Sequence, residues 1–411
     1  MTILGVNARA NALCTAHKPD HFDLERIVRP NILSLQPYHT VRDDFQVNVL
    51  LDANENSYGP MLGESSELAT RMDLHRYPAP ALMGTRRAIT QLRGMPDDAF
   101  TFLGVGSDEV IDLLFRCFAR PEHDKVLICP PTYPMYKVSA AVNDVGIVSV
   151  PLVLDGTSFA VDVPKVLEAL RTDPSIKMVF LCSPGNPTGS LLSRESIQAV
   201  LDCPDYNGLV IVDEAYIDFP LEEQAMGLRY VGESISAVDL VPSYANLVVS
   251  QTLSKSFGLA GVRLGVAFAQ PPTIQIMNNT KAPYSISAPS AYFAAQALSP
   301  EGIAKMRACT RTLIENRRQL IEALGDVPNL GRVLGNNDAN FVLVQVLRDG
   351  EPSSERASEV YHAMAQNHGL MVRNRSAELG CAGCLRISVG TPEENARAVA
   401  LLTQLLGDAS A

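Results

Sequence analysis

Short apolar runs alternate with amphipathic stretches through the middle of the chain. Five runs rich in Val, Ile and Leu are nearly continuous, and they cover residues 126–130, 146–152, 177–184, 208–216 and 246–251. Between them, residues 163–172 and 193–202 repeat apolar side chains at helical spacing. Continuous apolar strands separated by helices indicate a mainly parallel sheet that helices cover on both faces. The pattern therefore predicts an α/β fold.

A smaller α+β unit is expected after this region, because a strand-like run at 341–347 precedes a helical stretch near 355–368 and a second strand-like run at 384–390. The predicted division of the whole chain follows from these changes of pattern. It gives a flexible extension at 1–21, an N-terminal arm and part of the small domain at 22–75, a large domain at 76–300 and a small C-terminal domain at 301–411.

Polar clusters follow the apolar runs, and they contain Tyr133, Asn186, Asp213, Tyr216 and Lys255. Taken singly, Asp213 could be a helix cap, Asn186 a turn former and Tyr133 a core residue. In open α/β sheets, however, ligands bind beyond the carboxyl ends of the strands. The recurrence of polar residues at successive strand ends therefore favours a ligand site at that edge.

Lys255 lies among small and apolar neighbours in the segment QTLSKSFGLAGVRLG. Burial and a nearby cation both lower the pKa of a lysine, and the neutral amine is the form that attacks carbonyl carbon. Lys255 is therefore a candidate Schiff-base lysine, although the tripeptide alone also suits a surface lysine beside a glycine turn. The hydroxyls of Thr252 and Ser254, with the guanidinium of Arg263, form a candidate phosphate site.

A glycine-rich turn enters an amphipathic helix at GVGSDEV, which begins at Gly104. Gly104 and Gly106 permit unusual backbone angles, and Ser107 or Asp108 can cap the helix. Free amides at the positive end of a helix bind anions, so this turn is a second candidate phosphate site. Most turns of this kind are only caps, and the nearby lysine segment is what favours the functional interpretation.

Composition limits the classes of function. The chain has 411 residues, of which 46% are hydrophobic and 19% charged, as in ordinary globular proteins, and its formal net charge of -11 argues against general affinity for nucleic acid or anionic membranes. It contains no apolar run of about 18 residues, so no membrane-spanning helix is expected. Most cysteines lie in apolar runs, which suits reduced thiols in the cytoplasm. Cys381 and Cys384 form a C-x-x-C without a second pair, so no metal site is expected.

The S/T-x-S-K sequence followed by G-x-x-G-x-R-x-G resembles the lysine segment of fold-type I pyridoxal-phosphate aminotransferases. A longer series resembles the histidinol-phosphate aminotransferases, especially the fungal type, from about Phe22 to the C-terminus. Its members, in chain order, are LDANEN, RYP, GVGSDE, PPTYPMY, SPGNPTG, VDEAYIDF, TLSKSFGLAGVRLG, KAPYSIS, DANF and GCLRISVGT. One departure is Ala79, where relatives often have aspartate.

The resemblance implies a fold-type I transferase with pyridoxal 5'-phosphate as cofactor. Lys255 would form the Schiff base and then move a proton between substrate and cofactor carbons. Asp213 would keep the pyridine nitrogen protonated, so that the ring acts as an electron sink. Tyr216 and Asn186 would donate to the ring oxygen, and Tyr133 would offer a flat face to the ring.

The same resemblance assigns the remaining site residues. The cofactor phosphate would meet the amides at Ser107 and Asp108, the two hydroxyls at 252 and 254, and Arg263. Tyr77 would reach the cofactor phosphate of a neighbouring subunit, which implies a homodimer with shared active sites. The phosphate of histidinol phosphate, or the carboxylates of glutamate, would meet Tyr38, Asn54, Glu55, Arg373 and Arg386. For the two arginines a structural alternative stays open, which is a salt bridge to Glu378 or to the arm.

The reaction implied is amino transfer between histidinol phosphate and 2-oxoglutarate, giving imidazole-acetol phosphate and glutamate, in L-histidine biosynthesis. Two alternatives on the same scaffold are a transaminase of aromatic amino acids and a phosphothreonine-type decarboxylase. A catalytically silent binding protein of the same fold is an alternative from another class. Such a protein would be expected to lack Lys255, Asp213 or Arg263, and all three are present.

Overall fold

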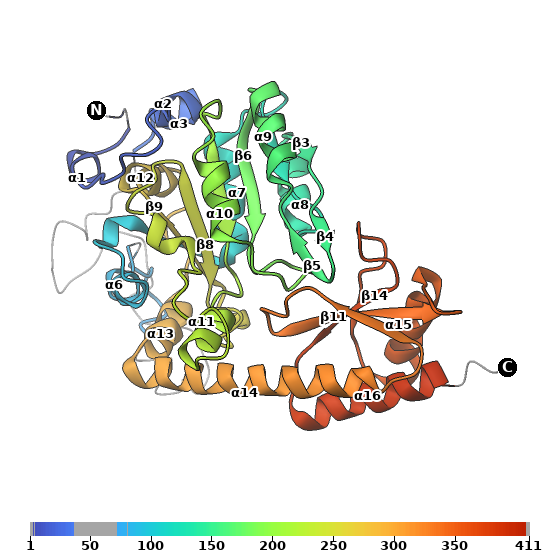
Figure 1. The fold of residues 1–411 in the computed structure, drawn as a ribbon. Coiled ribbons are helices and arrows are strands. Elements are labelled where there is room, and N and C mark those ends of the chain that lie inside the picture. The colour runs from blue at the N-terminus through green and yellow to red at the C-terminus, as the bar shows by residue number, and fades with distance from the viewer. Residues whose placement is uncertain (1–2, 4, 37–71, 80, 408–411) are drawn as a thin grey trace.

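The structure is a computed structural model that describes residues 3, 5–36, 72–79 and 81–407. It has a large unit and a smaller one, and the long helix α14 (Pro300–Gly325) runs along the base of both (Figure 1). The expected division of the chain at residues 22, 76 and 301 stays a prediction.

The large unit is built on a seven-stranded sheet of order β1-β9-β8-β7-β6-β2-β3. Its strands are β1 (Thr101–Val105), β2 (Lys125–Ile128), β3 (Gly146–Ser149), β6 (Ile176–Cys182), β7 (Leu209–Asp213), β8 (Leu247–Thr252) and β9 (Leu264–Ala269). The pairs from β8 across to β3 are parallel, whereas β9 is antiparallel to both β8 and β1. The mainly parallel sheet expected from the apolar runs is confirmed.

Helices cover both faces of this sheet, which explains why its strands are apolar without interruption. Neighbouring residues of one strand, such as Val210 and Ile211, enter two separate core clusters. The helices are α6 (Met83–Leu92), α7 (Gly106–Phe118), α8 (Met135–Val142), α9 (Val163–Thr172), α10 (Arg194–Leu201), α11 (Asp218–Ala225), α12 (Pro271–Thr280) and α13 (Ala288–Ala297). Shorter elements are the hairpin β4 (Val153–Asp155) and β5 (Ser158–Ala160), and 3-10 turns at Asp98–Phe100, Ala237–Leu240 and Ala260–Val262.

The small unit is a second sheet, of order β10-β11-β14-β13, with β12 paired to β11. Its elements are β10 (Leu330–Leu334), β11 (Phe341–Arg348), β12 (Glu351–Pro352), β13 (Arg373–Asn374), β14 (Cys384–Ser388), α15 (Ser354–His368) and α16 (Pro392–Gly407). Leu385 and Ile387 of β14 share a core with side chains of α14, α15 and α16. Cys384 instead packs in a cluster with Phe159 of the large unit, so the opposite face of this sheet turns toward the large unit.

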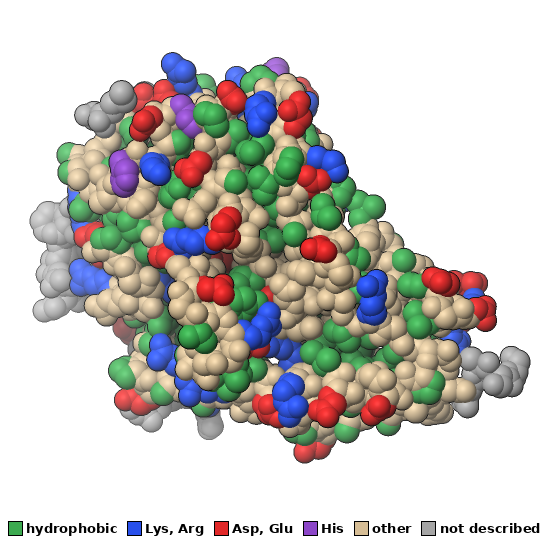
Figure 2. Space-filling view, in the orientation of Figure 1, with side chains coloured by type: hydrophobic (Ala, Val, Ile, Leu, Met, Phe, Trp, Pro, Cys, Tyr) green, Lys and Arg blue, Asp and Glu red, His purple; other side chains and the backbone are tan. Residues whose placement is uncertain are grey.

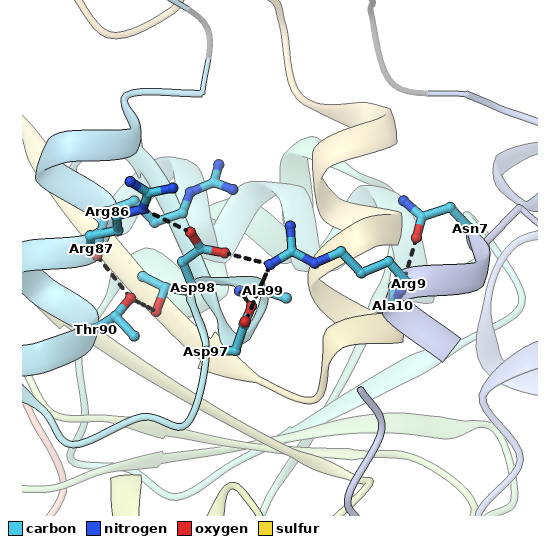
Figure 3. A network of polar contacts seen from close by, with 10 residues as sticks. Asn7, Arg9, Ala10, Arg86, Arg87, Thr90, Asp97, Asp98 and Ala99 are labelled. Atoms are coloured by element: carbon cyan, nitrogen blue, oxygen red, sulfur yellow. Dashed lines mark hydrogen bonds and ion pairs between the residues drawn. The ribbon is translucent and has the colours of Figure 1, made fainter. Parts of the chain in front are cut away.

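The N-terminal segment packs against the large unit through α1 (Ala8–Ala12), α2 (Leu24–Ile27) and α3 (Pro30–Leu33). Val6 and Ile27 are buried in the core cluster that contains α7 and α12. At the surface, Arg9 reaches Asp97 at 2.9 Å and Asp98 at 3.2 Å (Figure 3). These contacts attach the first helix to the turn that precedes β1.

Charged side chains of both signs are interspersed over the face of the molecule shown in Figure 2. Among the helices of the described ranges, none combines the length and the apolar character that crossing a membrane requires. In the same ranges, no group of three or more His, Cys, Asp or Glu side chains is arranged to hold a metal ion.

Candidate functional site

The carboxyl ends of the central parallel strands lie at one edge of the large sheet. Asp213, the last residue of β7, is the cross-strand partner of Cys182 on one side and of Ser250 on the other. The polar turns that follow these strands therefore start next to one another. The expected gathering of polar residues at this edge follows directly from the parallel pairing.

Asp213 is buried, with 3% of its surface exposed, beneath this edge. The hydroxyl of Tyr136 donates to its Oδ2 at 2.7 Å, whereas Oδ1 is buried and has no hydrogen-bond partner in the described ranges. Burial raises the pKa of Asp213 to about 6, and the bond from Tyr136 opposes that rise. Oδ2 is thus fixed by the bond from Tyr136, and Oδ1 is available to a donor in the site.

Lys255 is half-buried, and its Nζ lies 5.5 Å from the centroid of the Tyr216 ring. Burial lowers the pKa of this lysine, and the positive charge of Arg386 lowers it further, while Asp108 and Asp213 oppose the change. Desolvation and a like charge are the two causes that favour a neutral amine. The environment therefore shifts Lys255 toward the neutral, nucleophilic amine relative to an exposed lysine.

Two backbone segments meet where the glycine-rich turn faces the start of β9. A Cβ added to Gly265 would lie 2.2 Å from the carbonyl carbon of Gly106 and 2.3 Å from the amide nitrogen of Ser107, so a side chain at 265 would require the backbone to shift. Gly106 has a φ of 72° and opens α7, whose first amides point out of the helix. Arg263 Nη2 donates to Asp108 Oδ2 at 3.2 Å beside that helix end.

The hydroxyls expected at the phosphate site lie next to each other after β8. Thr252 Oγ1 donates to Ser254 Oγ at 2.9 Å, and the amide of Ser254 donates back to Thr252 Oγ1 at 3.1 Å. Tyr133 donates to Asp108 Oδ1 at 3.1 Å, which ties its ring to the first turn of α7. The arrangement combines helix amides, hydroxyls and a guanidinium, which are the donors that an oxyanion needs.

Arg386 connects the small unit to this edge. Its Nη1 donates to Asn186 Oδ1 at 2.5 Å, its guanidinium lies 5.2 Å from the centroid of the Phe341 ring, and its Nε is buried without a partner. Arg373 lies directly opposite Arg386 in the β13–β14 ladder and is exposed. A hydrogen bond between residues 186 and 386 thus joins the two units at the site.

A buried chain of hydrogen bonds, which the sequence did not indicate, supports the lysine segment from below. Gln251 donates to Glu214 Oε2 at 2.8 Å and accepts from Arg93 Nε at 2.7 Å. Arg93 also donates to Asp218 at 2.7 Å, and Ser256 donates to the other oxygen of Asp218 at 2.5 Å. Because Glu214 follows Asp213 and Ser256 follows Lys255, the chain links the backbones of the two central residues.

Some expected site residues do not join these contacts. Tyr38, Asn54 and Glu55 lie outside the described residues. Tyr77 is 53% exposed and stacks on Tyr284 with ring centroids 4.8 Å apart. The buried partner of Asp213, Tyr136, was missed because a tyrosine on the buried face of a helix reads as an ordinary core residue.

Comparison with known proteins gives the class first. The family model described as Aminotransferase class I and II matches residues 45–402. The chain therefore belongs to the class I and II aminotransferases, in agreement with the fold-type I architecture expected from the lysine segment.

Curated relatives narrow this class. Proteins named histidinol-phosphate aminotransferase from Candida maltosa and Schizosaccharomyces pombe are 42% and 44% identical to the chain. The first match covers 94% of this chain and 99% of the relative, and the second covers 91% and 95%. At this identity and coverage the chain is a member of the histidinol-phosphate aminotransferase family.

Solved structures confirm the fold. A histidinol-phosphate aminotransferase from Sinorhizobium meliloti, solved in complex with pyridoxal-5'-phosphate, has a TM-score of 0.70 at 22% identity and covers 87% of this chain and 90% of its own. An L-threonine-O-3-phosphate decarboxylase from Porphyromonas gingivalis has a TM-score of 0.63 at 19% identity, with coverage of 82% and 92%. The same fold therefore occurs with different reactions, and the fold alone does not choose between them.

The residues present fit a phosphorylated pyridine cofactor. The buried Oδ1 of Asp213 is an acceptor without a donor among the residues that the structure describes, as a protonated ring nitrogen requires. The glycines at 106 and 265 leave open the anion cradle at the start of α7, which a Cβ would fill. Lys255 lies near both features, since the negative charges of Asp213 and Asp108 both act on its pKa.

Proposed function

We propose that this chain transfers an amino group reversibly between histidinol phosphate and 2-oxoglutarate, giving imidazole-acetol phosphate and glutamate. The observation that carries the proposal is the identity of 42–44% to relatives of that name over more than nine-tenths of the chain. The site supports it, because an activated lysine, a buried carboxylate and a cluster of arginines converge at one edge. In this proposal the enzyme acts in the cytoplasm, in the biosynthesis of L-histidine.

Pyridoxal 5'-phosphate, when bound, supplies the electron sink that allows a proton to leave a carbon next to nitrogen. The chain's own residues divide the remaining work. The carboxylate of Asp213 would accept from the ring nitrogen and hold its proton, and Tyr136, which donates to that carboxylate, stabilises its charged form. Asn186 and Tyr216 would donate to the ring oxygen, and Tyr133 would offer its face to the ring.

The phosphate of the cofactor would be held by the amides at Ser107 and Asp108, by Thr252 and Ser254, and by Arg263. A permanent charge with amides at a helix start suits a phosphate dianion. Bound in this way, the phosphate would anchor the cofactor beside Lys255. Lys255, whose pKa is lowered by burial, would then act as the base that takes the proton from the amino-bearing carbon of the substrate and as the acid that returns it.

The acid groups of both substrates would bind at Arg386 and Arg373, with Tyr38, Asn54 and Glu55 also contributing. A phosphate and a carboxylate can share such a site because a guanidinium binds either in a bidentate manner. Arg386 donates to Asn186 Oδ1 at 2.5 Å, and its charge opposes the rise that burial gives to the pKa of Tyr216, which supports a substrate site beside these residues.

We also propose a homodimer in which Tyr77 reaches the cofactor phosphate in the partner's site. The exposed ring of Tyr77 and the apolar helix α13, whose Phe293 is 40% exposed, support an interface on this side of the large unit. Tyrosines with one apolar and one polar end are typical of interfaces.

The test is the visible absorbance of the purified protein loaded with the cofactor, before and after histidinol phosphate is added without a keto acid. The proposed activity converts the absorbance band to that of the aminated cofactor, and 2-oxoglutarate restores it. An absorbance band that histidinol phosphate leaves unchanged but that phenylalanine converts would indicate a transaminase of aromatic amino acids. Release of CO₂ from phosphothreonine would indicate a decarboxylase, and full turnover by Lys255→Ala would refute the mechanism.

A further inference from the structure

Arg375 lies two residues after Arg373 and continues the same edge of the small sheet. Arg373 is the cross-strand partner of Arg386, and the amide of Arg375 donates to the carbonyl of Cys384 at 2.8 Å, so the pairing extends to residue 375. Side chains two residues apart on a strand share a face, and so do directly opposite residues. Arg373, Arg375 and Arg386 therefore belong to one face of the sheet.

That face turns toward the large unit. Leu385, between Cys384 and Arg386, packs on the helical side of the sheet, whereas Cys384 packs with Phe159 of the large unit. The charges of Arg386 and Arg375 both oppose the rise that burial gives to the pKa of Tyr216. Arg375 is thus close enough to the residues of the site to act on them electrostatically.

The hydrogen bonds of Arg375 leave part of its guanidinium available. Its Nη1 donates to Glu378 Oε1 at 2.8 Å, and its side chain is 15% exposed. Within the described part of the chain, its Nε is buried without a hydrogen-bond partner, as is the Nε of Arg386. A buried donor without an acceptor is unfavourable unless a ligand supplies one.

The charges around these arginines do not balance. The positive charges of Arg375 and Arg373 lower the pKa of Arg386, and among the described residues Glu378 is the carboxylate that opposes this effect. A carboxylate ligand brings one negative charge and two oxygens. A phosphate monoester brings a charge of about −1.5 to −2 near neutral pH and three acceptor oxygens. The local surplus of positive charge suits the phosphate ester better.

We propose that Arg375 is a further substrate-binding arginine, which contacts the phosphate ester and discriminates in favour of it over the carboxylate of the amino donor. The proposal rests on the proposed function, since it names a residue that serves that same site. Glu378 orients the guanidinium from the outer side and leaves Nε directed at the ligand. Arg375 is then a specificity determinant beyond Arg373 and Arg386.

The experiment compares Arg375→Gln with the parent enzyme, using KM and kcat for histidinol phosphate and for glutamate. We expect kcat/KM for histidinol phosphate to fall about tenfold or more, carried by KM, because a hydrogen bond to a charged group is lost. The value for glutamate is expected to change less than about threefold. Arg375→Lys should recover part of the loss, since it keeps the charge without the fork.

Arg318→Gln is the matched control, because Arg318 is an exposed arginine of α14 that pairs with Glu315 away from the site. This variant should leave KM and kcat unchanged for both histidinol phosphate and glutamate. Equal losses for the two substrates in Arg375→Gln, or no loss for either, would overturn the proposal. If Arg375→Gln does not fold, the same comparison on Arg375→Lys decides, with a selective loss for histidinol phosphate expected.

Inhibition by inorganic phosphate separates this proposal from the proposed function. Phosphate should compete with glutamate in the absorbance assay, and the inhibition should weaken about tenfold in Arg375→Gln. If the enzyme does not convert histidinol phosphate but phosphate still inhibits Arg375→Gln more weakly than the parent, the proposed function is refuted and Arg375 remains a phosphate contact. Equal inhibition of the parent and the variant would refute the role of Arg375.

Discussion

Replacing Asp213 by asparagine separates what this carboxylate does for catalysis from what it does to stability. Burial raises its pKa from an ordinary value of 3.8 to about 6. Because one pKa unit corresponds to 1.36 kcal/mol, the buried anion destabilises the cofactor-free fold by roughly 3 kcal/mol at neutral pH. Well below pH 4 the group is protonated in both the folded and the unfolded chain, so this penalty is absent there, and near pH 4 it is already less than about 1 kcal/mol.

The sign of the pH dependence follows from linkage. Between about pH 4 and pH 6 the folded protein binds more protons at this site than the unfolded chain, so stability falls as pH rises. Asparagine has a similar shape and no titration. Cofactor-free Asp213→Asn should therefore match the parent near pH 4 and exceed its stability above pH 6, by up to about 3 kcal/mol, less what the new amide loses in hydrogen bonds.

The assay is urea unfolding of both proteins without cofactor, at equal protomer concentration, across pH 4–8. In parallel, amino transfer should fall at least ten- to a hundredfold, since a hydrogen bond to a charged group contributes roughly 1.5–3 kcal/mol. Tyr136→Phe serves as a control that removes a donor to the anion and should lower stability at neutral pH. A stability difference that does not grow with pH, or that has the opposite sign, would refute the reasoning.

Three further substitutions test other parts of the structure. Gly265→Ala should lower the free energy of unfolding by about 1–3 kcal/mol or more and weaken cofactor retention, measured by dialysis, because the added Cβ would lie 2.2 Å from backbone. Gly261→Ala is the control and should behave as the parent, because a Cβ at that position has nothing within 4 Å. Ser256→Ala removes a donor from the buried carboxylate of Asp218, so kcat should fall several-fold at unchanged KM, and an unchanged kcat would argue against the supporting role. Arg9→Ala should lower the free energy of unfolding, measured with urea, by less than about 1 kcal/mol, because its side chain is 64% exposed. A larger effect would mean that the first helix is integral to folding.

The parts of the fold that could be predicted are those in which local pattern and burial coincide. The parallel strands are legible because both of their faces are covered, so Val210 and Ile211 are both apolar although they enter different cores. The helix from Gly106 could be predicted from its apolar stripe and its glycine-rich start. The expected cap at Ser107 or Asp108 was wrong, because both residues lie inside the helix, whose N-cap is Val105 without a side-chain cap bond. The polar residues at strand ends, such as Asp213 and Lys255, were found because parallel strands end at one edge.

Features that depend on how distant elements meet could not be read from the chain. Tyr136 donates to Asp213 across 77 residues of sequence, and nothing near Tyr136 marks that bond. The chain through Arg93 and Asp218 likewise spans 125 residues. Arg375 differs from these, since its spacing from Arg373 was visible in the sequence. Only the pairing with β14 shows that both lie on the face of the small sheet that turns toward the large unit.

The hydrogen bond between Asn186 and Arg386 connects residues that are 200 positions apart, one in the turn after β6 of the large unit and the other in β14 of the small sheet. Asp213 ends β7, and Lys255 lies in the turn after β8, whereas Arg373 and Arg386 lie on two strands of the small sheet. Under the proposed function, the groups that break bonds and the groups that bind the substrate acids thus belong to different units. A copy of this chain made by gene duplication would then acquire a new amino donor or acceptor through substitutions in β13, β14 and the turn between them, with the large sheet unchanged.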